Sequence, residues 1–228
     1  MDERTLGRPP KIPEFPVLTK EDLKEIKSLR LNLWHQSQKG KFLGFELYAG
    51  GEVLGEGGIF INSVITLGQV LNAMAITRHP FVKEIADPSF NMENFNAQAL
   101  VEGKIMTGLK ILDLGSSRYP YFARCCRTMG ADVWTVDMDS IPEFYHRKSP
   151  IPEEAKKLEI EKHIQLNLND PRAADIIMKK TGGNFNLVTE SNLGADGFSK
   201  GRDIAWPLIK KGGIYDNVTM VKMELKED

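Results

Sequence analysis

Apolar residues recur at two different spacings along this chain, and the two spacings separate the expected helices from the expected strands. In the first hundred residues they recur three or four positions apart, which is the helical period. This spacing predicts helices from Leu23 through LKEIKSLRLNLWH and over Asn62–Arg78. Pro80 and Pro88 interrupt the next segment, residues 79–95, which is expected to hold one short helix.

The residues at and before the start of the first helix carry local signals. Residues 1–16 contain four prolines and predict an extended arm, ordered only if it packs on the body of the protein or on a partner. Thr19 is the expected cap of the helix, with Asp22 at the second position of a capping box.

The segment between these two helices is rich in glycine. Phe42–Tyr48 is expected to be a strand, Gly50-Gly51 the turn of a β-hairpin, and Glu52–Ile61 the returning strand. A plain surface hairpin is the favoured interpretation. The alternative is a mobile loop that closes over a ligand, because three further glycines weaken the returning strand.

The stretch KILDLGSSRYPYFARCCRTMGADVWTVDMD, residues 110–139, organises the second half of the chain. It predicts a strand that stops at Gly115, a helix that ends at Met129-Gly130, and a second strand over Asp132–Val136. A strand–turn–helix–strand unit of this length is typical of a parallel crossover, which is right-handed. Helices and strands go on alternating: helices are expected over 152–162, 171–180 and 203–211, and strands over 163–168, 185–189 and 214–225.

Composition narrows the class of protein. The chain has 228 residues, 41% hydrophobic and 27% charged, which is ordinary for a soluble globular protein. Its formal net charge of −1 gives no sign of a nucleic-acid or membrane partner. The two cysteines are the adjacent residues Cys125 and Cys126. Neighbouring side chains on a helix point in different directions, so neither a shared metal site nor a disulfide between them is expected. No apolar run is long enough to span a bilayer, and a cytoplasmic setting is expected.

The turn after the first strand has the residues of a nucleoside-binding site. Gly115, Ser116 and Ser117 are small enough for a ligand to approach the backbone closely. Backbone N–H groups and a helix start follow the strand and favour ligands that accept hydrogen bonds. Asp137 ends the second strand 22 positions after Gly115, where a carboxylate can accept hydrogen bonds from two ribose hydroxyls.

Asp113 precedes the turn, so the sequence reads Asp113-Leu114-Gly115-Ser116-Ser117-Arg118-Tyr119. This resembles the S-adenosylmethionine (SAM) site of the class I methyltransferases, where an acidic residue is followed by x-Gly-x-Gly-x-Gly. Ser117 and Tyr119 stand where that family has its second and third glycines. The same departure argues against a dinucleotide, because a pyrophosphate needs very close approach to the backbone and SAM has no phosphate.

The resemblance implies an α/β fold, with a Rossmann-like, doubly wound, mostly parallel sheet that lacks the family's last strands. It covers roughly residues 110–225. The expected division of the chain is an N-terminal region, 1–100, mainly helical with the hairpin and on the substrate side, and a SAM-binding domain, 101–228. Three alternatives stay open for the missing strands: the N-terminal hairpin replaces them, another chain covers the edge of the sheet, or the edge is exposed. An exposed edge invites pairing with a second copy of the chain.

The resemblance also implies roles for single residues. The backbone of Gly115, Ser116 and Ser117 would grip SAM, with Asp113 near the methionine ammonium and Asp137 on the ribose. Three further residues are expected around the adenine: Met138, Asn167 and Leu168.

Two further residues are candidates for chemistry. Glu190, at the end of the fourth strand, is the candidate catalytic or substrate-orienting acid, and a solvated loop acid is an equal alternative. His146 could be a general base, although a lone loop histidine is more often solvated.

The expected function is therefore transfer of a methyl group from SAM to an unidentified acceptor. A small metabolite, a protein side chain and RNA all stay open, while the absence of an acid or Asn before Pro-Pro and an aromatic lowers the case for DNA bases. A non-catalytic scaffold with a methyltransferase-like fold is the main alternative. A nicotinamide oxidoreductase is a weaker one.

Overall fold

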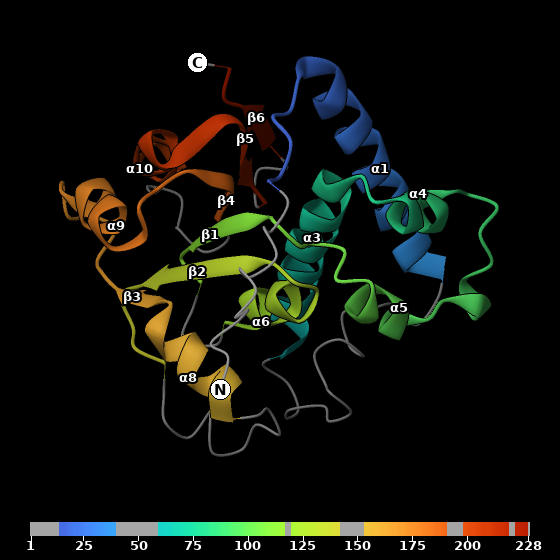
Figure 1. Ribbon diagram of the computed structural model, residues 1–228, viewed down its shortest axis with the longest axis horizontal. Helices are drawn as coiled ribbons and strands as arrows, with labels where there is room; N and C mark the ends of the chain where they lie inside the picture. The colour runs from blue at the N-terminus through green and yellow to red at the C-terminus, as the bar shows by residue number, and fades with distance from the viewer. Residues whose placement is uncertain are drawn as a thin grey trace, which may run out of the picture.

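The computed structural model describes residues 14–39, 59–116, 120–141, 153–190, 198–218 and 222–227. Within these residues a six-stranded sheet forms the centre of the molecule, in the order β3-β2-β1-β4-β5-β6 (Figure 1). The strands are β1 Lys110–Leu114, β2 Asp132–Asp137, β3 His163–Gln165, β4 Phe185–Glu190, β5 Ile209–Asn217 and β6 Lys222–Leu225. The first five run parallel and β6 is antiparallel to β5. This α/β arrangement is compatible with a Rossmann-like fold.

Helices cover both faces of the sheet (Figure 1). Those described are α1 Lys20–Lys39, α3 Ile59–Thr77, α4 Pro80–Ala86, the 3-10 helix η1 Met92–Asn94, α5 Ala97–Glu102, α6 Tyr121–Thr128, α8 Glu153–Glu161, α9 Ala173–Thr181 and α10 Phe198–Leu208. Side chains of α1, α3, α4 and α6 share a hydrophobic core with Ile111 and Leu187. Those of α9 and α10 share a second core with Leu112 and Val188. Because neighbouring residues of a strand point to opposite faces, we name the two sides the α3 face and the α10 face.

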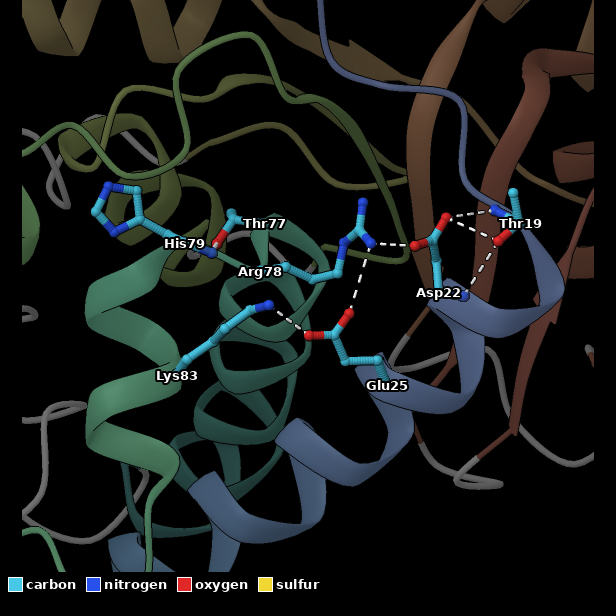
Figure 2. A network of polar contacts seen from close by, with 7 residues as sticks. All are labelled: Thr19, Asp22, Glu25, Thr77, Arg78, His79 and Lys83. Carbon is cyan, nitrogen blue, oxygen red and sulfur yellow. Dashed lines mark hydrogen bonds and ion pairs between the residues drawn. The ribbon is translucent and has the colours of Figure 1, made fainter.

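Ion pairs join α1 to the junction of α3 and α4 (Figure 2). The predicted capping box is confirmed, because the Asp22 N–H donates to Thr19 Oγ1 at 3.2 Å and the Thr19 N–H donates to Asp22 Oδ2 at 2.8 Å. The Asp22 carboxylate also pairs with Arg78, just after the end of α3. Lys83 of α4 lies 2.5 Å from a carboxylate oxygen of Glu25. One turn of α1 thus holds both neighbouring helices.

The described part of the expected N-terminal arm packs on strand β5. The Leu18 N–H donates to the carbonyl of Gly212 at 3.3 Å, and Lys210 Nζ donates to the carbonyl of Phe15 at 2.9 Å. Leu18 itself is buried. Residues 14–18 therefore pack on the body of the protein, which is one of the two settings considered for the arm of residues 1–16. Residues 1–13 lie outside the described part.

The helix α3 begins at Ile59, three residues before the predicted helix. Residues 59–61 are therefore helical, and their prediction as the end of a returning strand is wrong. In the sequence these three residues stand directly before the predicted helix, and the helix includes them. The rest of the expected hairpin, residues 42–58, lies outside the described residues.

The predicted helix end at Lys210–Gly213 is also wrong. Helix α10 ends at Leu208, and these residues belong to β5, where the register with β4 shifts between Phe185 and Leu187. Gly212 has a φ of 70° there, a backbone conformation that glycine adopts without strain. The cation-then-glycine pattern thus marks an irregular strand and not a helix stop.

The sequence predicts one strand over 214–225 and no strand beyond it, whereas the structure has two. Tyr215 of β5 pairs with Glu224 of β6, and the two strands form an antiparallel pair. The described sheet therefore ends on β6, one strand later than expected. The division of the chain at residue 100 stays a prediction, and no helix among the described residues is long and apolar enough to cross a membrane.

Candidate functional site

Four parallel strands carry an acidic residue in one of their last two positions. These are Asp113 of β1, Asp137 of β2, Glu190 of β4 and Asp216 of β5. The carboxyl ends of parallel strands lie at one edge of a sheet, which we call the carboxyl edge. The strand order reverses between β1 and β4, and Leu114 is the register partner of Glu190 at this point. Open α/β sheets bind ligands at such a switch point.

The turn that follows β2 is held firmly in place. The Asp137 carboxylate, half-buried, accepts a hydrogen bond from the Asp139 N–H at 3.0 Å. Each of the three carbonyls of this turn accepts a hydrogen bond from a donor on or next to β3. The Leu166 N–H donates to the carbonyl of Asp137 at 2.7 Å, and Gln165 Nε2 donates to that of Met138 at 3.2 Å. His163 Nε2 donates to the carbonyl of Asp139 at 2.8 Å. The backbone that carries the Asp137 carboxylate is therefore fixed before any ligand arrives.

The turn that follows β1 uses its backbone N–H groups within the sheet. Both the Gly115 and the Ser116 N–H donate to the carbonyl of Val136, at 2.9 and 3.2 Å. Gly115 makes this possible with a φ of 70°. The sequence suggested that these N–H groups would bind a ligand, whereas in the structure they bind β2. Ser117 lies outside the described residues, as do Arg118 and Tyr119.

Asp113 lies beneath α3 and is 1% exposed. Gln69 of α3 donates through Nε2 to Asp113 Oδ1 at 3.1 Å and to Thr189 Oγ1 at 3.4 Å. Burial raises the pKa of Asp113 to about 8; Gln69 lowers it, and the nearby charge of Asp137 raises it further. The two acids that the sequence predicted at one site are therefore close enough to influence each other.

A second buried acid, Asp216, has a parallel arrangement. Asn72, also on α3, donates through Nδ2 to Asp216 Oδ2 at 2.7 Å. Burial raises the pKa of Asp216 to about 6, opposed by the Asn72 hydrogen bond. The strand registers place Thr135, Asp113, Thr189 and Asp216 in one row across the α3 face.

Sequence reasoning missed Gln69 and Asn72, because the apolar spacing of α3 suggested that its polar residues face solvent. In the structure Gln69 is 3% exposed and Asn72 5%. A usable signal exists in the spacing of Thr66, Gln69 and Asn72, which forms a polar stripe on an otherwise apolar helix.

Glu190 lies on the opposite, α10 face, because its neighbour Thr189 contacts α3. It is 2% exposed, so it is a buried strand residue and not a solvated loop acid. The Asn217 side-chain amide donates to Glu190 Oε1. Burial raises the pKa of Glu190 to about 7, while Tyr215 and Asn217 lower it and Asp216 raises it.

The residues expected around the adenine lie at the β2–β3 side of the carboxyl edge. Met138 is 67% exposed to solvent. Asn167 is exposed and its Oδ1 accepts the Asn169 N–H at 2.9 Å, which uses the amide oxygen locally. Leu168 packs partly against the core of the α10 face. His146 lies outside the described residues.

Comparisons of the chain with protein-family models, curated proteins and solved structures found no match. Over the ranges that the structure describes, no group of three or more His, Cys, Asp or Glu side chains could hold a metal ion. Cys125 and Cys126 are buried free thiols, and burial raises the pKa of both. The carboxyl edge therefore provides carboxylates, amides and hydroxyls as its chemical groups.

Proposed function

We propose that this protein binds SAM at the carboxyl edge of β1, β2 and β4 and transfers its methyl group to an acceptor. The observation that carries the proposal is the Asp137 carboxylate. It is held at the end of β2 by a turn whose three carbonyls are engaged by β3, and it stands beside the switch point of the sheet. A carboxylate in this place suits the two hydroxyls of a ribose.

The strand arrangement supports the same proposal. The order of the five parallel strands is that of doubly wound nucleotide-binding sheets, which bind their ligand outside the carboxyl ends at the switch point. The class I methyltransferases, which the sequence resembles around Asp113 and Gly115, continue after the fifth strand with a helix and an antiparallel pair of strands. Here β6 is the next described element after β5 and pairs with it antiparallel, so the support comes from the five parallel strands alone.

The hydrogen bonds of the β1 turn favour SAM over a dinucleotide. The N–H groups of Gly115 and Ser116 already donate to Val136, so they are not offered to a pyrophosphate. SAM has no phosphate and does not need them. When bound, SAM supplies a methyl group on a sulfonium, which is electrophilic. The residues of this chain would supply grip and placement, with catalysis coming chiefly from holding the acceptor in line.

Asp113 fits the methionine ammonium in chemistry, since a carboxylate accepts charge-assisted hydrogen bonds. In the structure Asp113 Oδ1 already accepts a hydrogen bond from the side-chain amide of Gln69. A ligand ammonium would have to replace this donor. Binding through Asp113 therefore requires an exchange of donors, from the Gln69 amide to the ligand.

The test is thermal unfolding of the full chain with SAM, with its demethylated product S-adenosylhomocysteine (SAH), and with NAD. A ligand at 100 times its dissociation constant stabilises the folded state by about 2.7 kcal/mol, which is roughly 5–10 °C for a chain of this size. We expect shifts with SAM and SAH and none with NAD.

The substitution Asp137→Ala should weaken SAM binding by about 1.5–3 kcal/mol, the range for a hydrogen bond to a charged group. The matched control is Asp132→Ala, at the amino end of the same strand, where the carboxylate pairs with Lys162. Equal affinities in the two variants would remove Asp137 from the site.

A non-catalytic scaffold is the second candidate, and the sealing of Asp113 by Gln69 favours it. A protein without a cofactor can keep this acid permanently paired and buried. No thermal shift with SAM, SAH or NAD at millimolar concentration would support the scaffold, and a shift with NAD alone would support an oxidoreductase.

A further inference from the structure

The imidazole ring of His163 is hydrogen-bonded at both nitrogens to β2 and to the turn that follows it. His163 begins β3 and is the register partner of Thr135, so it extends to β3 the row of polar side chains on the α3 face. Its Nδ1 lies 3.0 Å from Thr135 Oγ1, and its Nε2 lies 2.8 Å from the carbonyl oxygen of Asp139. Thr135 is fully buried and His163 is half-buried. The ring therefore links the interior of the sheet to the turn that carries Asp137.

The two partners determine which nitrogen of the neutral ring carries the proton. A carbonyl oxygen only accepts hydrogen bonds, so Nε2 must be protonated to bind Asp139. Nδ1 is then the acceptor, and the Thr135 hydroxyl donates to it. On a charged ring Nδ1 would also be a donor, and this hydroxyl would have to turn to the carbonyl of Lys162, which lies 3.4 Å away and already accepts the Thr135 N–H. The arrangement therefore suits the neutral ring.

His163 reaches the proposed ribose acid through one residue. The carbonyl of Asp139 accepts the hydrogen bond from the ring, and the N–H of Asp139 donates to Asp137 Oδ1 at 3.0 Å. The direction of the Asp137 carboxylate therefore depends on how the ring holds Asp139. The other two donors to this turn are the Leu166 N–H and the Gln165 amide, and neither changes its charge near neutral pH. Of the three donors, His163 is the one that titrates there.

We propose that neutral His163 is a positioning residue of the nucleoside site, and that SAM binds more weakly when this ring is protonated. The inference rests on the proposed function, in which Asp137 accepts the ribose hydroxyls. Hydroxyls that donate to this carboxylate draw off part of the negative charge that favours a protonated ring. The sulfonium charge of SAM acts in the same direction. The bound ligand and the ring proton therefore oppose each other.

Charged groups on neighbouring elements also act on the ring, within the described part of the chain. Burial lowers the pKa of His163, and the hydrogen bond to the Asp139 carbonyl raises it. The charge of Asp137 raises it too, whereas those of Arg127 on α6 and Lys180 on α9 lower it. Burial has the largest effect, so the ring is neutral at pH 7.5 and becomes charged in acid. A ligand that weakens the influence of Asp137 lowers this pKa further.

The first experiment observes the ring itself, by NMR of the isotope-labelled full chain, which contains four histidines. We expect His163 to be the Nε2–H tautomer at pH 7.5. Saturation with SAH should lower its pKa by about 0.5–1 pH unit, and SAM should lower it at least as far. His35, which is exposed on α1, is the internal control and should titrate at the same pH with and without ligand.

The second experiment measures SAM affinity by calorimetry at pH 7.5 and pH 5.5. Glu190 and Asp216, with pKa values of about 7 and 6, also titrate in this range, so the contribution of His163 is obtained by comparison with a variant. His163→Gln keeps an amide N–H for Asp139 and does not titrate. From pH 7.5 to 5.5 the wild type should lose about two- to fivefold more affinity than this variant. His35→Gln is the matched control and should behave as the wild type.

The same variants separate positioning from mere packing. At pH 7.5 His163→Gln should bind SAM within about threefold of the wild type, because its amide replaces the Nε2–H donor. His163→Leu keeps the bulk of the side chain and loses the donor to Asp139, so its affinity should be about three- to tenfold lower. Equal affinities of the Gln and Leu variants would show that the hydrogen bond to Asp139 does not position the site.

The outcomes are distinct. If neither SAM nor SAH changes an NMR signal or gives binding heat, the proposed function is wrong, and this proposal with it. If SAH binds while the pKa of His163 stays unchanged or rises, this proposal alone is overturned. The Nδ1–H tautomer, or equal pH dependence in the wild type and H163Q, would overturn it as well. The NMR measurement uses the wild-type chain, so it decides the question without any variant that fails to fold.

Discussion

At the residue scale, two amides on α3 determine how two buried acids are paired. Gln69 and Asn72 each donate to a carboxyl group that would otherwise stand unpaired beneath the helix. An unpaired buried acid costs more than a hydrogen bond normally contributes, so these amides matter more than exposed ones. Both also lower pKa values that burial raises. α3 thus sets the protonation of the row of side chains next to the proposed site.

Gln69→Leu keeps the size of the side chain and removes the donor to Asp113. We expect the free energy of unfolding to fall by about 1–3 kcal/mol, the cost of leaving a buried acid without its donor. Urea denaturation at pH 7 measures it. Gln38→Leu, at an exposed position on α1, is the control. Equal stability of the two variants would show that the Gln69–Asp113 contact is not formed.

At the scale of elements, α1 is fixed to α3 and α4 by one short run of charged residues. Asp22 serves twice, as the partner of Thr19 at the helix cap and as the partner of Arg78 (Figure 2). Arg78 has a φ of 50°, unusual for a residue other than glycine, at the point where α3 turns into α4. The ion pair thus stabilises a strained corner as well as a helix end.

Asp22→Ala should lower the free energy of unfolding by about 1–3 kcal/mol, because it removes both the cap and the pair with Arg78. Thr19→Ala removes the cap alone and should cost about 0.5–2 kcal/mol. Denaturation at low and at high salt measures both. The excess cost of D22A over T19A should shrink at high salt, and an excess that is independent of salt would argue against the ion pair.

The residues that sequence reasoning placed correctly depend on neighbours close in the chain. The Thr19–Asp22 cap and the strand predicted over Asp132–Val136, which extends one residue further to Asp137, are decided by local spacing. Local spacing does not decide the role of Gln69, because its partner Asp113 lies 44 positions away in the sequence. Asn72 and its partner Asp216 are 144 positions apart. Periodicity assigns a polar residue to solvent unless such a distant partner is known.

The wrong prediction for residues 210–213 also arose because local spacing was used without knowledge of distant contacts. Lys210 and Gly212 form a common helix-stop pattern, but the helix had already ended and Gly212 serves an irregular strand. The same distinction applies to the residues of the candidate site. The position of Asp137 could be predicted from the length of a crossover, whereas the burial of Glu190 depends on distant residues such as Asn217 of β5, which donates to its carboxylate.

At the scale of the whole molecule, the sheet buries three acids near one edge. The pKa values of Asp113, Glu190 and Asp216 are raised to about 8, 7 and 6, whereas in an unfolded chain such groups titrate near 4. The folded state therefore binds more protons than the unfolded state between about pH 4 and pH 8. Stability is lost as the pH rises through this range, and the loss ends above the highest of the three values.

We expect the free energy of unfolding to be about 1–3 kcal/mol lower at pH 8.5 than at pH 6.5, with the change between pH 7 and 8 due mainly to Asp113. His163, with a pKa lowered by burial, acts in the opposite sense below about pH 6.5, so the comparison is made above it. Urea titrations at several pH values measure it. Asp113→Asn should flatten the upper part of the curve, and a wild type that gains stability with pH would contradict the burial of these acids.

The contact between Leu18 and Gly212 bears on the order in which the molecule can assemble during synthesis. An added Cβ at position 212 would lie 2.4 Å from Val17 Cγ1 and 2.7 Å from the Leu18 nitrogen, so the main chain of the N-terminal segment rests directly on this glycine. The surface that receives the segment is made from residues translated close to two hundred codons later. The segment before α1 therefore stays incompletely packed during synthesis until β5 has emerged.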